Sequence, residues 1–159
     1  ATSGVGFMLH ELAHKVVAVR FGQVAHFRAD YGMLFVAVMS GFVGFLFAAP
    51  GAVHHRGRIT RRENGLIALA GPMVNLALFV VFAAIAALAS PVSLLGIAGA
   101  VGVFVNAFLA GFNLIPYGPL DGRSVFRWNK VVWAVCFVPS VLLAVGVVFG
   151  VVDFGAIDV

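Results

Sequence analysis

The sequence predicts an all-α membrane protein, a polytopic helical bundle built from about five apolar segments. Of its 159 residues, 62% are hydrophobic and only 10% are charged, and the mean hydropathy is +1.09. A soluble domain of this length keeps roughly a quarter of its residues charged, so we expect most of this surface to face lipid. The length fits one domain that comprises residues 1–159.

Five apolar stretches define the expected elements in chain order. They cover approximately residues 5–21, 33–49, 65–89, 92–114 and 131–152. A helix needs ~20 apolar residues to cross a hydrocarbon core about 30 Å thick. The third, fourth and fifth stretches reach that length, whereas the first and second are marginal.

The second stretch, residues 33–49, is open to three interpretations. It could be a full span, a re-entrant segment, or extended β structure packed against the bundle. Residues 23–38 include β-favouring side chains, and Gly32, Gly41 and Gly44 would weaken a helix. We therefore allow for a small β or re-entrant element between the first and third stretches.

Short polar connections separate the later stretches. Ser90-Pro91 divides the third from the fourth, as in a tight turn between antiparallel helices. Residues 116–130 contain two prolines and Gly118 between them, so a helix cannot run through them unbroken. Basic residues gather at 56–62 and 123–130, and the positive-inside rule places both groups on the same, cytoplasmic side.

The formal net charge of +4 does not indicate a nucleic-acid-binding protein. Most basic residues fall in the two loops and do not alternate with exposed aromatic or polar groups. Their arrangement suits membrane topology and contact with anionic lipid. Cys136 is the single cysteine, which excludes an internal disulfide and a cysteine-rich zinc site.

The first stretch carries the residues that point to chemistry, His10-Glu11-Leu12-Ala13-His14. Positions i and i+4 lie on one face of a helix, so both imidazoles can reach one zinc ion. Glu11 adjoins that face and could act as general base on a zinc-activated water. Ionisable groups within an apolar segment are costly and normally functional. Two histidines and a glutamate paired only for packing are the weaker alternative.

A catalytic zinc site needs a third protein ligand and keeps its fourth position for water. The other carboxylates are Asp30, Glu63, Asp121, Asp153 and Asp158. Asp121 is favoured, because prolines interrupt the helix before it and could bring its carboxylate back toward the bundle. The alternative is an ordinary turn aspartate before Gly122. We do not expect His26, His54 or His55 to bind this zinc, because they lie in polar connections.

His10 to His14 is followed about a hundred residues later by Asn-x-x-Pro-x-x-Pro-x-Asp-Gly at residues 113–122. This pair of motifs resembles the site-2 protease family of intramembrane zinc metalloproteases. Gly-Pro-Met-Val-Asn at residues 71–75 is similar to a small-residue and proline motif in the central helix of that family. The resemblance extends from His10 to about Arg127 and suits a minimal prokaryotic or archaeal enzyme.

The resemblance implies one Zn²⁺ per chain, bound by His10, His14 and Asp121, with Glu11 as the catalytic acid/base. It also implies that Asn113 lies near the metal and steadies the substrate or the tetrahedral intermediate. A side-chain amide can donate a hydrogen bond to a developing oxyanion.

The other reading of an asparagine in a membrane segment is hydrogen bonding between helices. We expect that structural role for Asn75 and Asn106. For Asn113 we favour the functional role.

The expected function is that of an intramembrane zinc metalloendopeptidase that hydrolyses peptide bonds within or beside the transmembrane helices of protein substrates. We expect a multi-pass protein of a prokaryotic or archaeal cell membrane, with its active site nearer the cytoplasmic side. Family members usually carry a transmembrane segment before the helix with the two histidines, whereas here almost nothing precedes it, so we allow for a domain that lacks this upstream segment.

Two alternatives are a membrane metal transporter and a catalytically inactive zinc-binding relative. A transporter would place several ligand positions along a path across the bilayer, whereas this sequence has one compact cluster. The intact Glu11 argues against an inactive relative.

Overall fold

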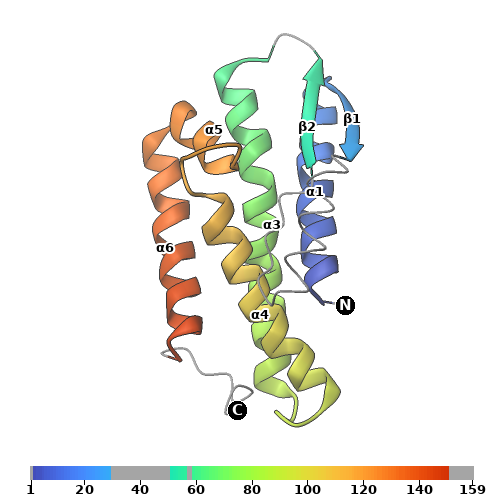
Figure 1. The fold of residues 1–159 in the computed structure, drawn as a ribbon, viewed down its shortest axis with the longest axis vertical. Helices are drawn as coiled ribbons and strands as arrows, with labels where there is room; N and C mark the ends of the chain where they lie inside the picture. Colours follow the sequence, from blue (N-terminus) through green and yellow to red (C-terminus); the bar gives the residue numbers. More distant parts are fainter. Residues whose placement is uncertain (1, 30–50, 57–58, 151–159) are drawn as a thin grey trace.

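The computed structural model describes residues 2–29, 51–56 and 59–150 (Figure 1). These residues form helices and two strands, in the order α1 (Thr2–Arg20), β1 (Val24–Ala29), β2 (Gly51–Arg56), α3 (Arg61–Leu88), α4 (Leu94–Asn113), α5 (Asp121–Trp128) and α6 (Lys130–Val148). The predicted helical bundle is confirmed. The second apolar stretch, residues 33–49, lies outside the described residues.

Three helices of the described chain, α3, α4 and α6, are long and apolar enough to cross a membrane. They correspond to the third, fourth and fifth predicted stretches. α3 begins at Arg61, ahead of its apolar stretch, because a capping box starts the helix. Thr60 Oγ1 accepts a hydrogen bond from Glu63 N at 3.2 Å, and Glu63 Oε2 accepts one from Thr60 N at 2.8 Å.

α3 and α4 pack closely through small residues. A Cβ on Gly99 would lie 2.7 Å from Ala86 N, and a Cβ on Gly102 would collide with the ring of Phe82. In lipid, close van der Waals packing of this kind is a main source of helix association. The adjoining buried cluster, which reaches α6, consists of Phe79, Val103, Ala107 and Val147.

A two-stranded antiparallel sheet lies between α1 and α3 in the sequence. β1 pairs with β2 in a register that runs from Val24 opposite Arg56 to Ala29 opposite Gly51. The expected β element between the first and third stretches is therefore present. Figure 1 shows the sheet beside α1.

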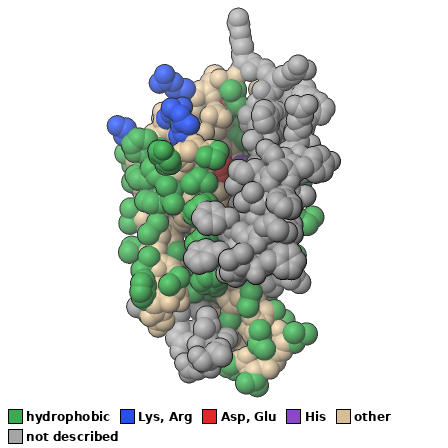
Figure 2. Space-filling view, in the orientation of Figure 1, with side chains coloured by type: hydrophobic (Ala, Val, Ile, Leu, Met, Phe, Trp, Pro, Cys, Tyr) green, Lys and Arg blue, Asp and Glu red, His purple; other side chains and the backbone are tan. Residues whose placement is uncertain are grey.

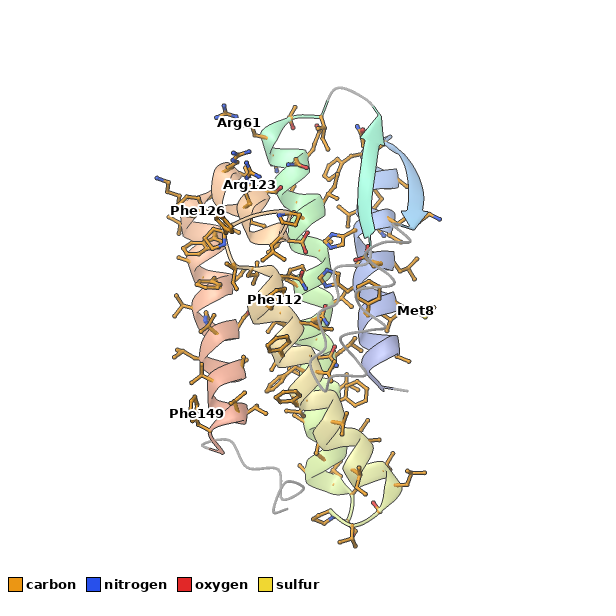
Figure 3. All side chains as sticks on the ribbon, in the orientation of Figure 1. Met8, Arg61, Phe112, Arg123, Phe126 and Phe149 are labelled. Carbon is orange, nitrogen blue, oxygen red and sulfur yellow. The ribbon has the colours of Figure 1, made fainter. Side chains whose placement is uncertain are left out.

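The basic residues gather at one end of the bundle. Figure 2 shows Lys and Arg side chains at one end of the face in view, with hydrophobic side chains along much of the rest of the described surface. Arg61 of α3 and Arg123 of α5 lie toward this end (Figure 3). The chain segments before α3 and after α4 thus meet at the same end, as the charge pattern predicts.

Candidate metal centre

α1 has one face that is buried in the bundle and one that is exposed. His10 and His14, which lie one turn apart, are only 3% and 6% exposed, whereas Met8 is 70% exposed. Met8 points away from the bundle (Figure 3). The spacing of four residues therefore turns both imidazoles inward together, as the motif predicts.

Three donor atoms from α1 and α5 meet inside the bundle. Asp121 Oδ2 lies 3.3 Å from His10 Nε2 and 3.2 Å from His14 Nε2, and the two Nε2 atoms are 2.9 Å apart. Zinc–ligand bonds of about 2.0–2.1 Å in a tetrahedron place their donor atoms about 3.3 Å apart. In the part of the chain that the structure describes, this is the one group of His, Cys, Asp or Glu residues placed to hold a metal ion.

Each imidazole also has a partner for its second nitrogen. His14 Nδ1 lies 2.7 Å from Ile67 O, and His10 Nδ1 lies 2.6 Å from Asn75 Oδ1. A backbone carbonyl only accepts, so His14 Nδ1 carries the proton and its Nε2 can offer a lone pair. Metal-binding histidines almost always have such a partner behind them. The residues therefore fit a zinc ion in both donor set and support.

α3 makes room for the two imidazoles at Gly71. A Cβ built there would lie 2.6 Å from His10 Nε2 and closer still to His14 Nε2. Any side chain at this position would displace both candidate ligands. Gly71 and Asn75, four residues apart on α3, thus face the two histidines that are four residues apart on α1. This contact explains why the Gly-Pro-Met-Val-Asn motif has a glycine and an asparagine four residues apart.

The turn between α4 and α5 brings Asp121 back to the bundle. α4 ends at Asn113, and Gly118 adopts a positive φ of 62° within the turn, which a glycine allows without strain. A Cβ on Gly122 would lie 2.6 Å from Ile115 O, so the start of α5 packs directly on the end of α4. Asp121 is therefore the first residue of α5 and follows the turn directly.

A polar contact ties α5 to α3. Asn64 Nδ2 donates a hydrogen bond to Ser124 Oγ at 3.2 Å. Gly65 lets the two helices approach, because a Cβ there would meet the side chain of Trp128 at 2.6 Å. These contacts hold α5 in place three and seven residues beyond the candidate ligand Asp121.

Glu11 lies beside the donor group without belonging to it. It is partly exposed and interacts electrostatically with His14, His10 and Asp121. This placement fits the predicted position next to the metal-binding face of α1.

Asn113 and the other predicted intramembrane asparagines differ in their partners. Asn113 Nδ2 donates to Leu109 O at 3.0 Å within its own helix. Asn75 Nδ2 donates to Asn106 Oδ1 at 3.1 Å, which is the helix-to-helix bond that we expected. The contact between Asn75 and His10 was not predicted. The matching four-residue spacing of Gly71–Asn75 and His10–His14 was the signal that could have indicated it.

In the part of the chain that the structure describes, no further histidine or carboxylate joins this donor group. The side chains of His26, His54 and His55 lie outside the described ones, as do Asp30, Asp153 and Asp158. Glu63 caps α3. The centre is therefore built from α1, α3 and α5, with one candidate base at its edge.

No family model and no solved structure matches the chain. A protein of Methanocaldococcus jannaschii named "putative zinc metalloprotease" is 43% identical to it over 140 residues, which are 87% of this chain and 73% of that relative. The chain belongs to this family of zinc metalloproteases. In this metalloprotease, two imidazoles and one carboxylate converge, a donor set that suits catalytic zinc because it leaves a fourth position for water.

Proposed function

We propose that this metalloprotease is an intramembrane protease of the site-2 type, which hydrolyses peptide bonds within or beside the transmembrane helices of its protein substrates. The observation that supports this most is the convergence of His10, His14 and Asp121 inside a bundle of apolar helices. Of the helices around this centre, α3 is itself long and apolar enough to cross a membrane. A centre among such helices suits substrates that share the same bilayer.

We assign the metal to His10, His14 and Asp121, with one Zn²⁺ per chain. Held there, zinc supplies Lewis acidity that makes a water molecule acidic enough to attack a carbonyl at neutral pH. Glu11 accepts the proton of that water as the new C–O bond forms at the substrate carbonyl. The same carboxyl then gives the proton to the amide nitrogen as the C–N bond breaks, which releases the amine product.

We assign Asn113 to the negatively charged oxygen that forms on the substrate. A side-chain amide has two N–H donors, and the bond to Leu109 O uses one of them. The second can donate to the oxyanion, where such a bond stabilises developing charge. Asn113 ends α4 and Asp121 begins α5, so one short turn joins the two residues.

The substrate must be locally unwound before it can react. In a transmembrane helix every backbone carbonyl is paired within the segment, and lipid offers no replacement partner. We place the centre nearer the cytoplasmic side, because Asp121 begins the helix that also carries Arg123 and Arg127. The partners implied are transmembrane protein substrates and anionic membrane lipid.

The decisive experiment compares wild type with Glu11→Gln in liposomes, with bound zinc and cleavage of a transmembrane peptide both measured. Glu63→Gln is the matched control, because it removes the same charge from the chain's other glutamate and keeps a residue type that completes a capping box. We expect Glu11→Gln to retain zinc and to lose cleavage by about 10²- to 10⁴-fold, the range for a general base. Glu63→Gln should cleave like wild type.

Three outcomes would contradict the proposal. Cleavage by Glu11→Gln at the wild-type rate would remove Glu11 from the mechanism. Zinc-loaded wild type that cleaves nothing but moves zinc into the liposomes would establish the transporter, whereas zinc binding with neither activity would establish the inactive relative.

A further inference from the structure

The amide groups behind His10 form a continuous chain of hydrogen bonds across three helices. His10 Nδ1 on α1 lies 2.6 Å from Asn75 Oδ1 on α3, and Asn75 Nδ2 donates to Asn106 Oδ1 on α4 at 3.1 Å. Asn106 Nδ2 donates to Gly102 O at 2.8 Å. Both asparagines are fully buried, so the chain is shielded from water.

The end of this chain fixes the direction of every bond in it. Gly102 O is a backbone carbonyl and can only accept, so the Nδ2 group of Asn106 must face it. Asn106 Oδ1 then faces Asn75 and requires a donor, which turns Asn75 Oδ1 toward His10. Only a protonated Nδ1 on His10 completes the sequence.

We propose that Asn75 and Asn106 are positioning residues that hold His10 in the Nδ1–H form, with the lone pair of Nε2 directed at the metal site. The inference rests on the proposed zinc centre. A wrong tautomer would put a proton on Nε2, where the metal must bind. A backbone carbonyl on α4 thus sets the protonation of a ligand on α1 through two side chains.

The two candidate histidine ligands differ in this respect. His14 is oriented by Ile67 O, a main-chain atom that no substitution removes. His10 is oriented by side chains alone, so its support can be changed by mutation without altering either ligand. α1 also packs directly against these hydrogen-bonded asparagines, because a Cβ on Gly6 would lie 2.8 Å from Asn106 Oδ1.

A purely structural role is the competing explanation, since asparagines often join membrane helices. The double variant Asn75→Val/Asn106→Ala separates the two explanations. It removes every amide group while keeping about the same total side-chain volume, and replacing both partners of a buried hydrogen bond by apolar groups costs little stability. His10 Nδ1 loses its partner, and Gly102 O loses the side-chain donor of Asn106.

The test measures zinc affinity by competition with a chelating indicator in detergent, alongside thermal unfolding of the metal-free protein. We expect the double variant to unfold near the wild-type temperature but to bind zinc 10- to 100-fold more weakly, the usual cost of losing such a partner. Ser140→Ala is the control, because Ser140 is equally buried but bonds only to Cys136 O of its own helix. Its zinc affinity should equal that of wild type.

A second pair of variants decides the matter if the double variant does not fold. Asn75→Asp keeps an acceptor oxygen for His10 Nδ1 and loses the N–H donor to Asn106 Oδ1, whereas Asn75→Ala removes both. We expect Asn75→Asp to bind zinc like wild type and Asn75→Ala to bind it more weakly.

Equal zinc affinities in wild type and a folded double variant, or in Asn75→Asp and Asn75→Ala, would overturn the inference. If the wild type in the same experiment binds zinc and cleaves its substrate, the proposed protease function would still stand. A wild type that binds no zinc would refute both.

Discussion

α3 and α6 are both apolar helices interrupted by a proline, yet only α3 contributes to the candidate centre. Pro72 of α3 is fully buried and lies between the residues that face the two histidines. Pro139 of α6 is exposed, and the polar residue beside it, Ser140, donates to Cys136 O of its own helix at 2.6 Å. The same sequence feature therefore has different consequences in the two helices.

The difference lies in where the polar atoms of each helix find partners. A proline leaves the carbonyl four residues earlier without its usual helical donor. In a membrane, the polar groups of that helical turn must find hydrogen-bond partners within the protein. In α6 the polar group turns back on its own helix, so its outer surface stays apolar. In α3, Ile67 O and Asn75 reach across to α1. Hydropathy identifies both helices, but only the partners of their polar atoms separate structure from function.

Of the substitutions that test this difference between α3 and α6, Gly71→Ala in α3 is expected to lower zinc affinity the most. The added methyl would collide with both imidazoles, so we expect zinc affinity to fall by about 100-fold or more, since both ligands move rather than one outer partner. Gly4→Ala is the control, because a Cβ at Gly4 meets nothing within 4 Å. Zinc titration of the two purified variants checks this. Normal zinc binding by Gly71→Ala would mean that α1 and α3 are farther apart than the structure shows.

A smaller effect is expected when the two prolines are exchanged for alanine. Pro72→Ala restores an N–H that can bond to the carbonyl of Ala68, which would change the local helix geometry and shift both Ile67 O and Asn75. We expect zinc affinity to fall by roughly tenfold, the lower end of the range for disturbed outer partners. Pro139→Ala should leave zinc affinity unchanged. Equal losses in the two variants, measured by the same chelator competition, would erase the distinction between α3 and α6.

Much of this arrangement follows from local patterns that the sequence displays. Apolar stretches of sufficient length predict α3, α4 and α6, and the i, i+4 spacing predicts that His10 and His14 share a face. The choice of Asp121 as third ligand rested on prolines that interrupt the helix before it. The structure brings its carboxylate to both histidines.

Other features depend on contacts between distant segments and were not predicted. α5 was missed, because its eight residues are polar enough to read as a loop beside two long apolar stretches. The role of Asn75 was also missed. Which face of α3 meets α1 depends on how the helices pack, and no pattern within α3 alone specifies that partner.

The smallest effect is expected on the outward face of α6. Leu142 is 65% exposed, and lipid is as apolar as leucine, so its side chain gains little from burial against the protein. We expect Leu142→Ala to change the unfolding free energy by less than about 0.5 kcal/mol, as is usual for surface substitutions, and to leave zinc affinity and cleavage unchanged. Reversible unfolding in mixed micelles checks the first quantity. A loss comparable to a buried leucine truncation, about 2–5 kcal/mol, would show that this face is covered in the working enzyme. α6 would then pack against a partner of its own. The two helices would differ in which partner they contact, and the exposed face of α6 would no longer mark it as a helix without a role.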